Sequence, residues 1–320
     1  MLAQLERRVD HILDNWYLGK RTENKRAENR FWCPCCANSD RASVKLSYVS
    51  VLEDDAPQRK YRKNNDPVRH FGQLKLLCSE IQLLLKYRGN THTVIYAGAA
   101  PGTHIPTLAR MFPEMNFVLV DPHPSALRNS NRIKVIQDCM TDSLAQELAR
   151  RFTNILFVSD VRIGAENPRT ESDYDQQVRI HNDMLSQLGW HRKLNPVASL
   201  FKFRLPWDME LQTAYLEGTI YLPIFGRQLT HESRLYVQRG AKMIMYDNKK
   251  YEGQMAYFNQ VQRVARYESD RCYDCTAFRA IVKEYLGEDA TPESVETMCT
   301  EIDQTLQRVT CAWEQQRPRF

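Results

Sequence analysis

The chain has 320 residues, of which 42% are hydrophobic and 26% charged, a balance typical of a globular protein. No apolar run approaches the roughly 20 residues that a membrane-spanning helix needs, and the opening residues lack the continuous apolar stretch of a signal peptide. These features argue against membrane and secreted proteins, so we expect a cytoplasmic protein whose nine cysteines are reduced. The formal net charge of +5 is mild and fits either a solvated surface or a polyanionic partner.

In chain order, the apolar spacing predicts a helix over residues 1–18 and then a basic, irregular stretch up to residue 65. From residue 66 onwards, short buried strands alternate with helices. Strands are expected at 93–97, 117–120, 133–136, 154–159, 196–203, 219–222, 233–238 and 243–246. Helices are expected at 71–87, 105–111, 144–152 and 174–188. The alternation favours an α/β domain of Rossmann-like fold, with a mostly parallel sheet covered by helices on both faces.

We expect three parts in the chain. They are an N-terminal helix with a basic, cysteine-containing extension at 1–65, the α/β domain at 66–286, and a C-terminal helix at 287–320. Thr291 is placed to cap that last helix, and Pro292 suits its first position. The apolar side of the helix fits docking on the domain, and a partner-binding helix is the alternative.

A glycine-containing turn follows the strand at 93–97 and opens the next helix. Gly98, Ala100, Pro101 and Gly102 in this turn let the backbone approach a ligand closely, and the helix N-terminus offers unpaired N–H groups. Asp121 ends the next strand, where an acid can accept hydrogen bonds from the hydroxyls of a ribose. The G-x-A-P-G spacing differs from the dinucleotide fingerprint, which favours a nucleoside without a pyrophosphate over a purely structural turn.

Four polar residues, Lys75, Asp160, Lys202 and Glu232, occur in or beside apolar segments at or near the expected functional edge of the sheet. Each has an ordinary explanation, such as an exposed lysine, a loop cap or a pair between Glu232 and Arg234. Together they suit methyl transfer to a ribose hydroxyl, which is a poor nucleophile and needs a base. A lysine can be that base when burial and a nearby cation lower its pKa, while the carboxylates orient the lysines.

Several of these stretches occur together in the order of one known family. They are residues 72–77, 96–105, 159–162, 195–199 with Lys202, and 232–235. The chain resembles the poxviral-type cap-specific mRNA (nucleoside-2′-O-)-methyltransferases, which also form the small regulatory subunit of poly(A) polymerase. The resemblance implies a class I S-adenosylmethionine-dependent methyltransferase that acts on the ribose 2′-OH of the first transcribed nucleotide of capped RNA. S-adenosylhomocysteine would be the second product.

The resemblance also implies roles for individual residues. Lys75, Asp160, Lys202 and Glu232 match the catalytic tetrad, with Lys202 as the base. The implied cofactor-binding residues are Tyr96, Gly98, Ala100, Pro101, Gly102, His104, Asp121 and Arg162. The implied cap-binding residues are Trp207, Asp208 and Glu252, and a tryptophan can stack on a cationic base.

The implied partners are the capped 5′ end of mRNA and either a poly(A) polymerase catalytic subunit or other capping enzymes. If the source is a virus, the expected location is the viral factory or the virion. Three alternatives stay open. They are a non-catalytic stimulatory subunit of poly(A) polymerase, a 2′-O-methyltransferase of uncapped RNA, and a dinucleotide-dependent oxidoreductase.

Two cysteine pairs have a spacing that zinc sites use. Cys33 and Cys36 form one pair, and Cys272 and Cys275 form the other. Four thiolates would make a structural zinc site chemically feasible if the fold brought the pairs together. Ordinary reduced thiols are the alternative.

Overall fold

The computed structural model describes residues 45–60, 72–164, 171–207, 211–226, 230–263, 265–267 and 271–316. Its centre is a seven-stranded sheet with the order β4-β3-β2-β5-β6-β9-β8. The strands are β2 (Thr93–Ala97), β3 (Asn116–Val120), β4 (Ile133–Ile136), β5 (Ile155–Ser159), β6 (Ala198–Phe203), β8 (Thr219–Tyr221) and β9 (Ser233–Gln238). Each of them lies where the apolar pattern predicts a strand.

The direction of the strands defines the fold class. Strands β4, β3, β2, β5 and β6 run parallel, whereas β9 is antiparallel to both of its neighbours, β6 and β8. A parallel sheet with one reversed strand next to its edge is the arrangement of class I methyltransferases, so the expected Rossmann-like fold is confirmed. All residues of β2 and β5 are buried, which explains why these strands are continuous apolar runs in the sequence.

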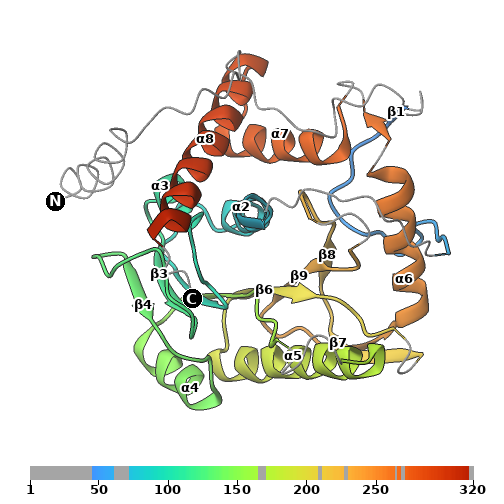
Figure 1. The fold of residues 1–320 in the computed structure, drawn as a ribbon, viewed down its shortest axis with the longest axis horizontal. Coiled ribbons are helices and arrows are strands. Elements are labelled where there is room, and N and C mark those ends of the chain that lie inside the picture. The colour runs from blue at the N-terminus through green and yellow to red at the C-terminus, as the bar shows by residue number, and fades with distance from the viewer. Residues whose placement is uncertain are drawn as a thin grey trace.

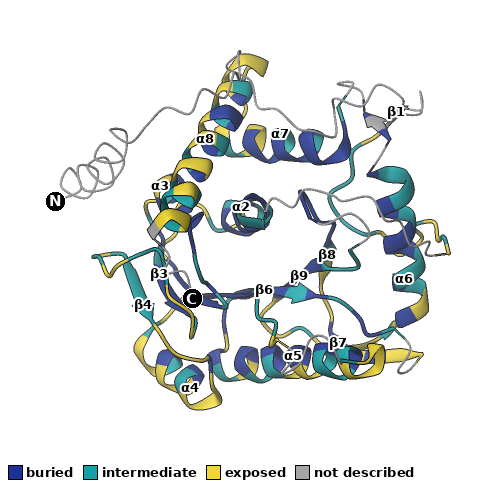
Figure 2. Cartoon of the chain, viewed as in Figure 1, coloured by how far each residue is buried: buried dark blue, intermediate teal, exposed yellow. Residues whose placement is uncertain are grey.

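Helices cover both faces of the sheet (Figure 1). One face carries α2 (Gly72–Leu85), α3 (Ile105–Met111), α7 (Tyr273–Leu286) and α8 (Pro292–Gln316), and the other carries α4 (Asp142–Arg151) and α5 (Asp173–Leu194). Buried residues concentrate in the central strands, whereas exposed residues lie on the outer sides of helices such as α4 (Figure 2). Among the helices in the described ranges, none has the length and apolar character needed to cross a membrane.

The C-terminal helix packs on the domain as expected. The backbone N–H of Ser294 donates to Oγ1 of Thr291 at 3.2 Å, so Thr291 caps α8, and Pro292 is its first residue. Val295, Ile302 and Leu306 are buried in the same core as the sheet. Docking on the domain is therefore the role that the structure supports for this helix.

Other elements differ from the expectation. The predicted strand at 243–246 exists as β10 (Met243–Asp247), but it pairs with the unpredicted β7 (Gln212–Leu216) in a separate two-stranded sheet. Helix α6 (Asn248–Tyr257) and the π-helix η2 (Phe258–Gln262) that continues it were not predicted either, nor was α7. Helix α6 lacks an apolar stripe because its buried residues include Asn248 and Gln254.

The described part of the N-terminal extension, residues 45–60, lies along the domain. Strand β1 (Lys45–Leu46) pairs with β11 (Arg266–Tyr267). The backbone N–H of Leu52 donates to the carbonyl of Ile220 in β8 at 2.8 Å, and that of Arg59 donates to the carbonyl of Gly253 in α6 at 2.9 Å. This segment therefore joins β8 to α6. The helix predicted at 1–18 lies outside the described residues.

Candidate active site

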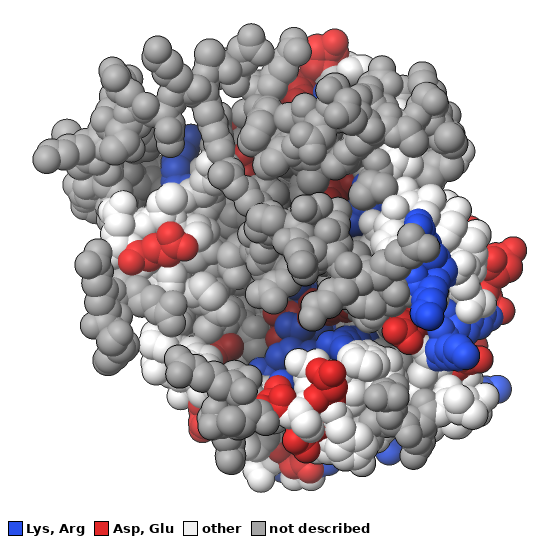
Figure 3. All heavy atoms as spheres, turned by 45° about the vertical axis from the view of Figure 1, so that its right-hand side comes forward, with Lys and Arg blue, Asp and Glu red and all other residues white. Residues whose placement is uncertain are grey.

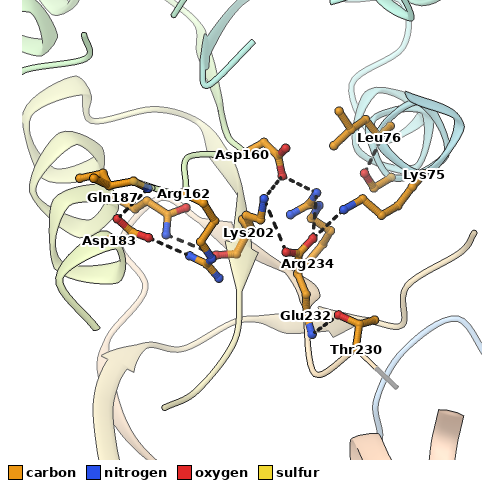
Figure 4. Close-up of polar contacts among 12 residues, drawn as sticks. Lys75, Leu76, Asp160, Arg162, Asp183, Gln187, Lys202, Thr230, Glu232 and Arg234 are labelled. Carbon is orange, nitrogen blue, oxygen red and sulfur yellow. Dashed lines mark hydrogen bonds and ion pairs between the residues drawn. The ribbon is translucent and has the colours of Figure 1, made fainter. Parts of the chain in front are cut away.

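Five charged side chains converge at the carboxyl edge of the sheet (Figure 4). Lys75 comes from α2, Asp160 follows β5, Lys202 lies on β6, Glu232 directly precedes β9, and Arg234 lies on β9. All five side chains are mostly buried, with exposed fractions between 7% and 21%. The four polar residues selected from the sequence are therefore brought to one place, although their segments are far apart in the chain.

The two carboxylates hold the two lysines. Nζ of Lys75 lies 2.7 Å from Oε1 of Glu232. Nζ of Lys202 lies 3.2 Å from Oδ1 of Asp160 and 3.5 Å from Oε2 of Glu232. Glu232 thus bridges the lysines, and the ammonium group of Lys202 is fixed between two acids from different strands.

Arg234 is a fifth member of the cluster, beyond the four residues that the sequence predicts. It is the register partner of Lys202 in the antiparallel β6–β9 ladder, so the two side chains lie on the same face of the sheet. Its Nη2 lies 2.6 Å from Oδ1 of Asp160 and 3.7 Å from Oε1 of Glu232. The ion pair between Glu232 and Arg234 that the sequence suggests is therefore present. Arg234 lies closer to Asp160, however.

The charges of this cluster influence one another because water is largely excluded. Burial lowers the pKa of Lys75, and the nearby Arg234 lowers it further. Burial alone would raise the pKa values of Asp160 and Glu232, but Arg234, Lys202 and Lys75 outweigh that effect and hold both values below their usual range. Three cations thus face two ionised carboxylates, and burial together with Arg234 favours loss of a proton from Lys75.

The glycine turn packs directly against the edge of the sheet that carries the charged cluster. Gly98 has φ +79°, and a Cβ atom on it would lie 2.9 Å from the carbonyl carbon of Asp160 and from the nitrogen of Val161. The backbone N–H of Asp160 donates to the carbonyl of Ala97 at 2.9 Å. Only glycine combines this backbone conformation with this approach, so the turn that could cradle a nucleoside is adjacent to Asp160.

Asp121 lies at the end of β3, as predicted, and joins two loops. Its Oδ2 accepts from the backbone N–H of Ala100 at 2.9 Å, and its Oδ1 accepts from that of His123 at 2.8 Å. Each carboxylate oxygen has two lone pairs. The side chain can therefore accept further hydrogen bonds from a ribose while it fixes the turn at Ala100 and Pro101.

Tyr96 and His104, two further implied cofactor residues, lie in the interior. Tyr96 is 1% exposed and His104 is fully buried. Nδ1 of His104 is 2.8 Å from Oε1 of Gln73, and Nε2 is 2.9 Å from Oε2 of Glu80. Both partners lie on α2, which also carries Lys75, so His104 ties the glycine turn to the helix of a candidate catalytic lysine.

Arg162 lies on the other side of Lys202, toward α5 (Figure 4). Its Nη1 is 3.5 Å from Oδ2 of Asp183, a fully buried residue of α5. Burial raises the pKa of Asp183 despite the opposing effect of Arg162. Arg162 is thus anchored beside the cluster through α5.

Comparison with known proteins identifies the family. The family described as "Poly A polymerase regulatory subunit" matches residues 46–293. The chain belongs to that family. It is 28% identical over 240 residues to the cap-specific mRNA (nucleoside-2′-O-)-methyltransferase of Myxoma virus (strain Lausanne), covering 68% of this chain and 69% of the relative. It is 25% identical over 236 residues to the protein of the same name from Fowlpox virus (strain NVSL), covering 67% and 75%. These matches confirm the resemblance drawn from the motifs.

Solved structures with a partial likeness include two from RNA-modifying proteins. Bluetongue virus VP4, described as an RNA-capping production line, is 14% identical with a TM-score of 0.46, over 85% of this chain and 44% of that one. A putative ribosomal RNA methyltransferase from Plasmodium falciparum is 12% identical with a TM-score of 0.37, over 54% of this chain and 98% of that one.

Two of the three residues that the resemblance implies for cap binding, Trp207 and Glu252, lie in the described ranges. Trp207 follows β6 and is half-buried, and its backbone N–H donates to Oε1 of Gln177 in α5 at 3.3 Å. Glu252 lies on α6. Asp208 lies outside the described residues.

The structure gives no support to the zinc site. Cys33 and Cys36 lie outside the described residues. Cys272 is the N-cap residue of α7, and Cys275 lies in its first turn, both buried. Within the ranges that the structure describes, no group of three or more His, Cys, Asp or Glu residues is arranged to hold a metal ion.

Proposed function

We propose that this protein is a cap-specific mRNA 2′-O-methyltransferase that transfers a methyl group from S-adenosylmethionine to the first transcribed nucleotide of capped RNA. One observation carries the proposal: the Gly98 turn packs on the backbone of Asp160, whose carboxylate holds Lys202. A nucleoside cofactor in that turn would lie next to a lysine base. The names of the Myxoma and Fowlpox virus relatives support the same reaction.

The residues present fit the cofactor. Gly98 and Gly102 have positive φ values, +79° and +73°, which let the turn fold tightly beside Asp160, and the carboxylate of Asp121 keeps lone pairs for ribose hydroxyls. We propose that Ala100 and Pro101 shape this turn, and that the buried Tyr96 and His104 support it from the core. When bound, S-adenosylmethionine supplies an electrophilic methyl group and leaves as S-adenosylhomocysteine.

The chain's own contribution is positioning and proton transfer. We propose that Nζ of Lys202, in its neutral form, accepts the proton of the ribose 2′-hydroxyl. The ammonium group that results stays paired with Asp160 and Glu232, which already contact it. Lys75 and Arg234 help to keep both carboxylates ionised, so that the carboxylates can stabilise the ammonium group that forms.

Recognition of the cap is assigned to the segment after β6 and to α6. We propose that Trp207 stacks on the cationic guanine and that Asp208 and Glu252 accept hydrogen bonds from its edge. Basic and acidic side chains occur together in a recess near the centre of one face, with a further basic group to its right (Figure 3). Basic side chains near the recess suit the phosphates of RNA.

The family match favours a second role. Because the family is described as a poly(A) polymerase regulatory subunit, we propose that the chain also binds a poly(A) polymerase catalytic subunit, in the cytoplasm of infected cells. Extension of an oligo(A) primer by that subunit, with and without this chain, would test the role. Stimulation by a Lys202→Ala variant would show that it is independent of methyl transfer.

The methyltransferase proposal is tested with labelled S-adenosylmethionine and short RNAs that differ only in the cap. We expect label in the capped RNA and little in the uncapped RNA. Equal labelling of both RNAs would favour a general 2′-O-methyltransferase instead. Binding of the cofactor without transfer to either RNA would favour a purely regulatory subunit.

A further inference from the structure

The segment that carries Glu232, residues 230–233, is held by a set of buried hydrogen bonds from α6 and η2, which we call the frame. Glu232 contacts both Lys75 and Lys202, so a shift of its backbone would disturb both lysines. The segment is not part of β9, which begins only at Ser233. Its position must therefore come from bonds other than the β-ladder.

The first bonds come from α6. The Tyr251 hydroxyl donates to the carbonyl of His231 at 2.5 Å and lies 2.9 Å from Oγ of Ser233. His231 and Ser233 are the two neighbours of Glu232 in the chain. Tyr251 is only 4% exposed, and burial raises its pKa, so the hydroxyl stays protonated and keeps its role as a donor.

The second set comes from the π-helix. Nδ2 of Asn259 donates to the carbonyl of Thr230 at 2.8 Å, and Oγ1 of Thr230 accepts from the backbone N–H of Glu232 at 3.0 Å. Oδ1 of Asn259 accepts from Nη1 of Arg263 at 3.3 Å, and the Arg263 guanidinium is held by Asp274 at 3.1 Å. The amide of Asn259 is therefore oriented from both ends.

The π-helix gives Asn259 this position. The backbone N–H of Arg263 donates to the carbonyl of Phe258 at 2.7 Å, five residues earlier, which is the wide turn of a π-helix. Nδ2 of Asn259 also donates to the carbonyl of Met255 at 2.8 Å. Asn259 is 1% exposed, and its side chain thus links the helix to the catalytic segment in the interior.

We propose that Tyr251 and Asn259 are positioning residues that fix Glu232, and through it Lys75 and Lys202, for methyl transfer. This inference rests on the proposed function. Both side chains bond to the backbone just before Glu232, at His231 and Thr230, and Tyr251 also contacts Oγ of Ser233 just after it. Because a displacement of about 1 Å can cost roughly a hundredfold in rate, loss of one anchor is expected to reduce turnover without weakening substrate binding.

The test uses the full chain and the Tyr251→Phe variant, which removes only the hydroxyl. Its matched control is Tyr215→Phe, because Tyr215 is equally buried and its hydroxyl donates to the carbonyl of Met184 in α5 at 3.0 Å, away from the segment. We expect kcat on capped RNA to fall roughly tenfold in Tyr251→Phe, with KM for RNA unchanged, and to stay near wild type in Tyr215→Phe. Equal kcat in both variants would overturn the inference.

A double-mutant cycle separates positioning from general stability. If Tyr251 acts through Glu232, then Tyr251→Phe has little further effect on the residual rate of Glu232→Gln. If Tyr251→Phe lowers kcat as much in the Glu232→Gln protein as in the wild type, the inference is contradicted.

A readout that needs no activity distinguishes this inference from the proposed function. Amide hydrogen exchange over residues 230–235 should rise in Tyr251→Phe and not in Tyr215→Phe. Unchanged exchange would overturn the positioning role even if the wild-type protein methylates capped RNA. An inactive wild-type protein would instead overturn the proposed function, and with it the catalytic purpose of the frame.

Discussion

Lys202 and Arg234 face each other across the β6–β9 ladder and contact the same atom, Oδ1 of Asp160, at 3.2 Å and 2.6 Å. A lysine that shares one carboxylate oxygen with a guanidinium lies beside a cation that does not titrate in the accessible pH range. The arrangement places a permanent positive charge beside Lys202, the base in the proposed mechanism.

Arg234→Met keeps the apolar stem and removes this charge. Because Arg234 lowers the pKa of Lys75, its removal should make proton loss from Lys75 harder. We expect kcat to fall roughly tenfold or more and the rising limb of the pH–rate profile to move to higher pH. Arg239→Met is the control, because Arg239 directly follows β9 and its guanidinium donates to the backbone carbonyls of Asn195 and Pro196. A profile that does not move would contradict the electrostatic role of Arg234.

Gly98→Ala should distort the turn that we propose binds the cofactor. The added Cβ would lie 2.9 Å from the backbone of Asp160, so the turn or the carboxylate must shift. Gly240→Ala is a matched control, because Gly240 has nearly the same φ, +81°, but nothing lies within 4 Å of its Cβ position. Both variants should lose about 1 kcal/mol from the left-handed backbone. Only Gly98→Ala should also bind S-adenosylhomocysteine more weakly, measured by calorimetry. If both variants bind it equally well, the close contact between Gly98 and Asp160 is not needed for cofactor binding.

His191 should make stability depend on pH on the acid side. Burial, and then Arg192, lower the pKa of His191 from 6.5 to about 4. The unfolded chain therefore binds a proton more readily, so the contribution of the neutral ring is complete above pH 6.5 and is lost as the pH falls toward 4. The difference corresponds to about 3 kcal/mol. His191→Gln should flatten the stability curve in this window, measured by urea unfolding, whereas a change in the exposed His123 should not.

The sequence predicted the sheet well because parallel strands buried on both faces carry a local signal. Lys202 stood out as a lysine in an apolar strand, and Asp160 as an acid at a strand end. The expected C-terminal helix was equally local, with Thr291 and Pro292 at its start. These features need no knowledge of distant parts of the chain.

Other features depend on contacts that no local pattern reveals. Arg234 acquires its role from its register opposite Lys202, which only the folded ladder defines. Helix α6 buries Tyr251 together with the polar Asn248 and Gln254, so its sequence resembles that of an exposed segment. Asn259 is an ordinary polar residue until the π-helix turns it toward Thr230. The zinc expectation depended on two distant cysteine pairs, and spacing within each pair says nothing of how far apart the pairs lie.

The most direct test of the central claim is to map the methyl group on capped RNA after incubation with the wild-type protein, Lys202→Ala, or Lys193→Ala. Lys193 pairs with Asp142 between α5 and α4 and serves as a surface control. We predict methylation of the first transcribed nucleotide's 2′ oxygen by the wild type and by Lys193→Ala. We predict at least a hundredfold loss in Lys202→Ala, with cofactor binding retained. Undiminished methylation by Lys202→Ala, or a methyl group elsewhere on the RNA, would contradict the account.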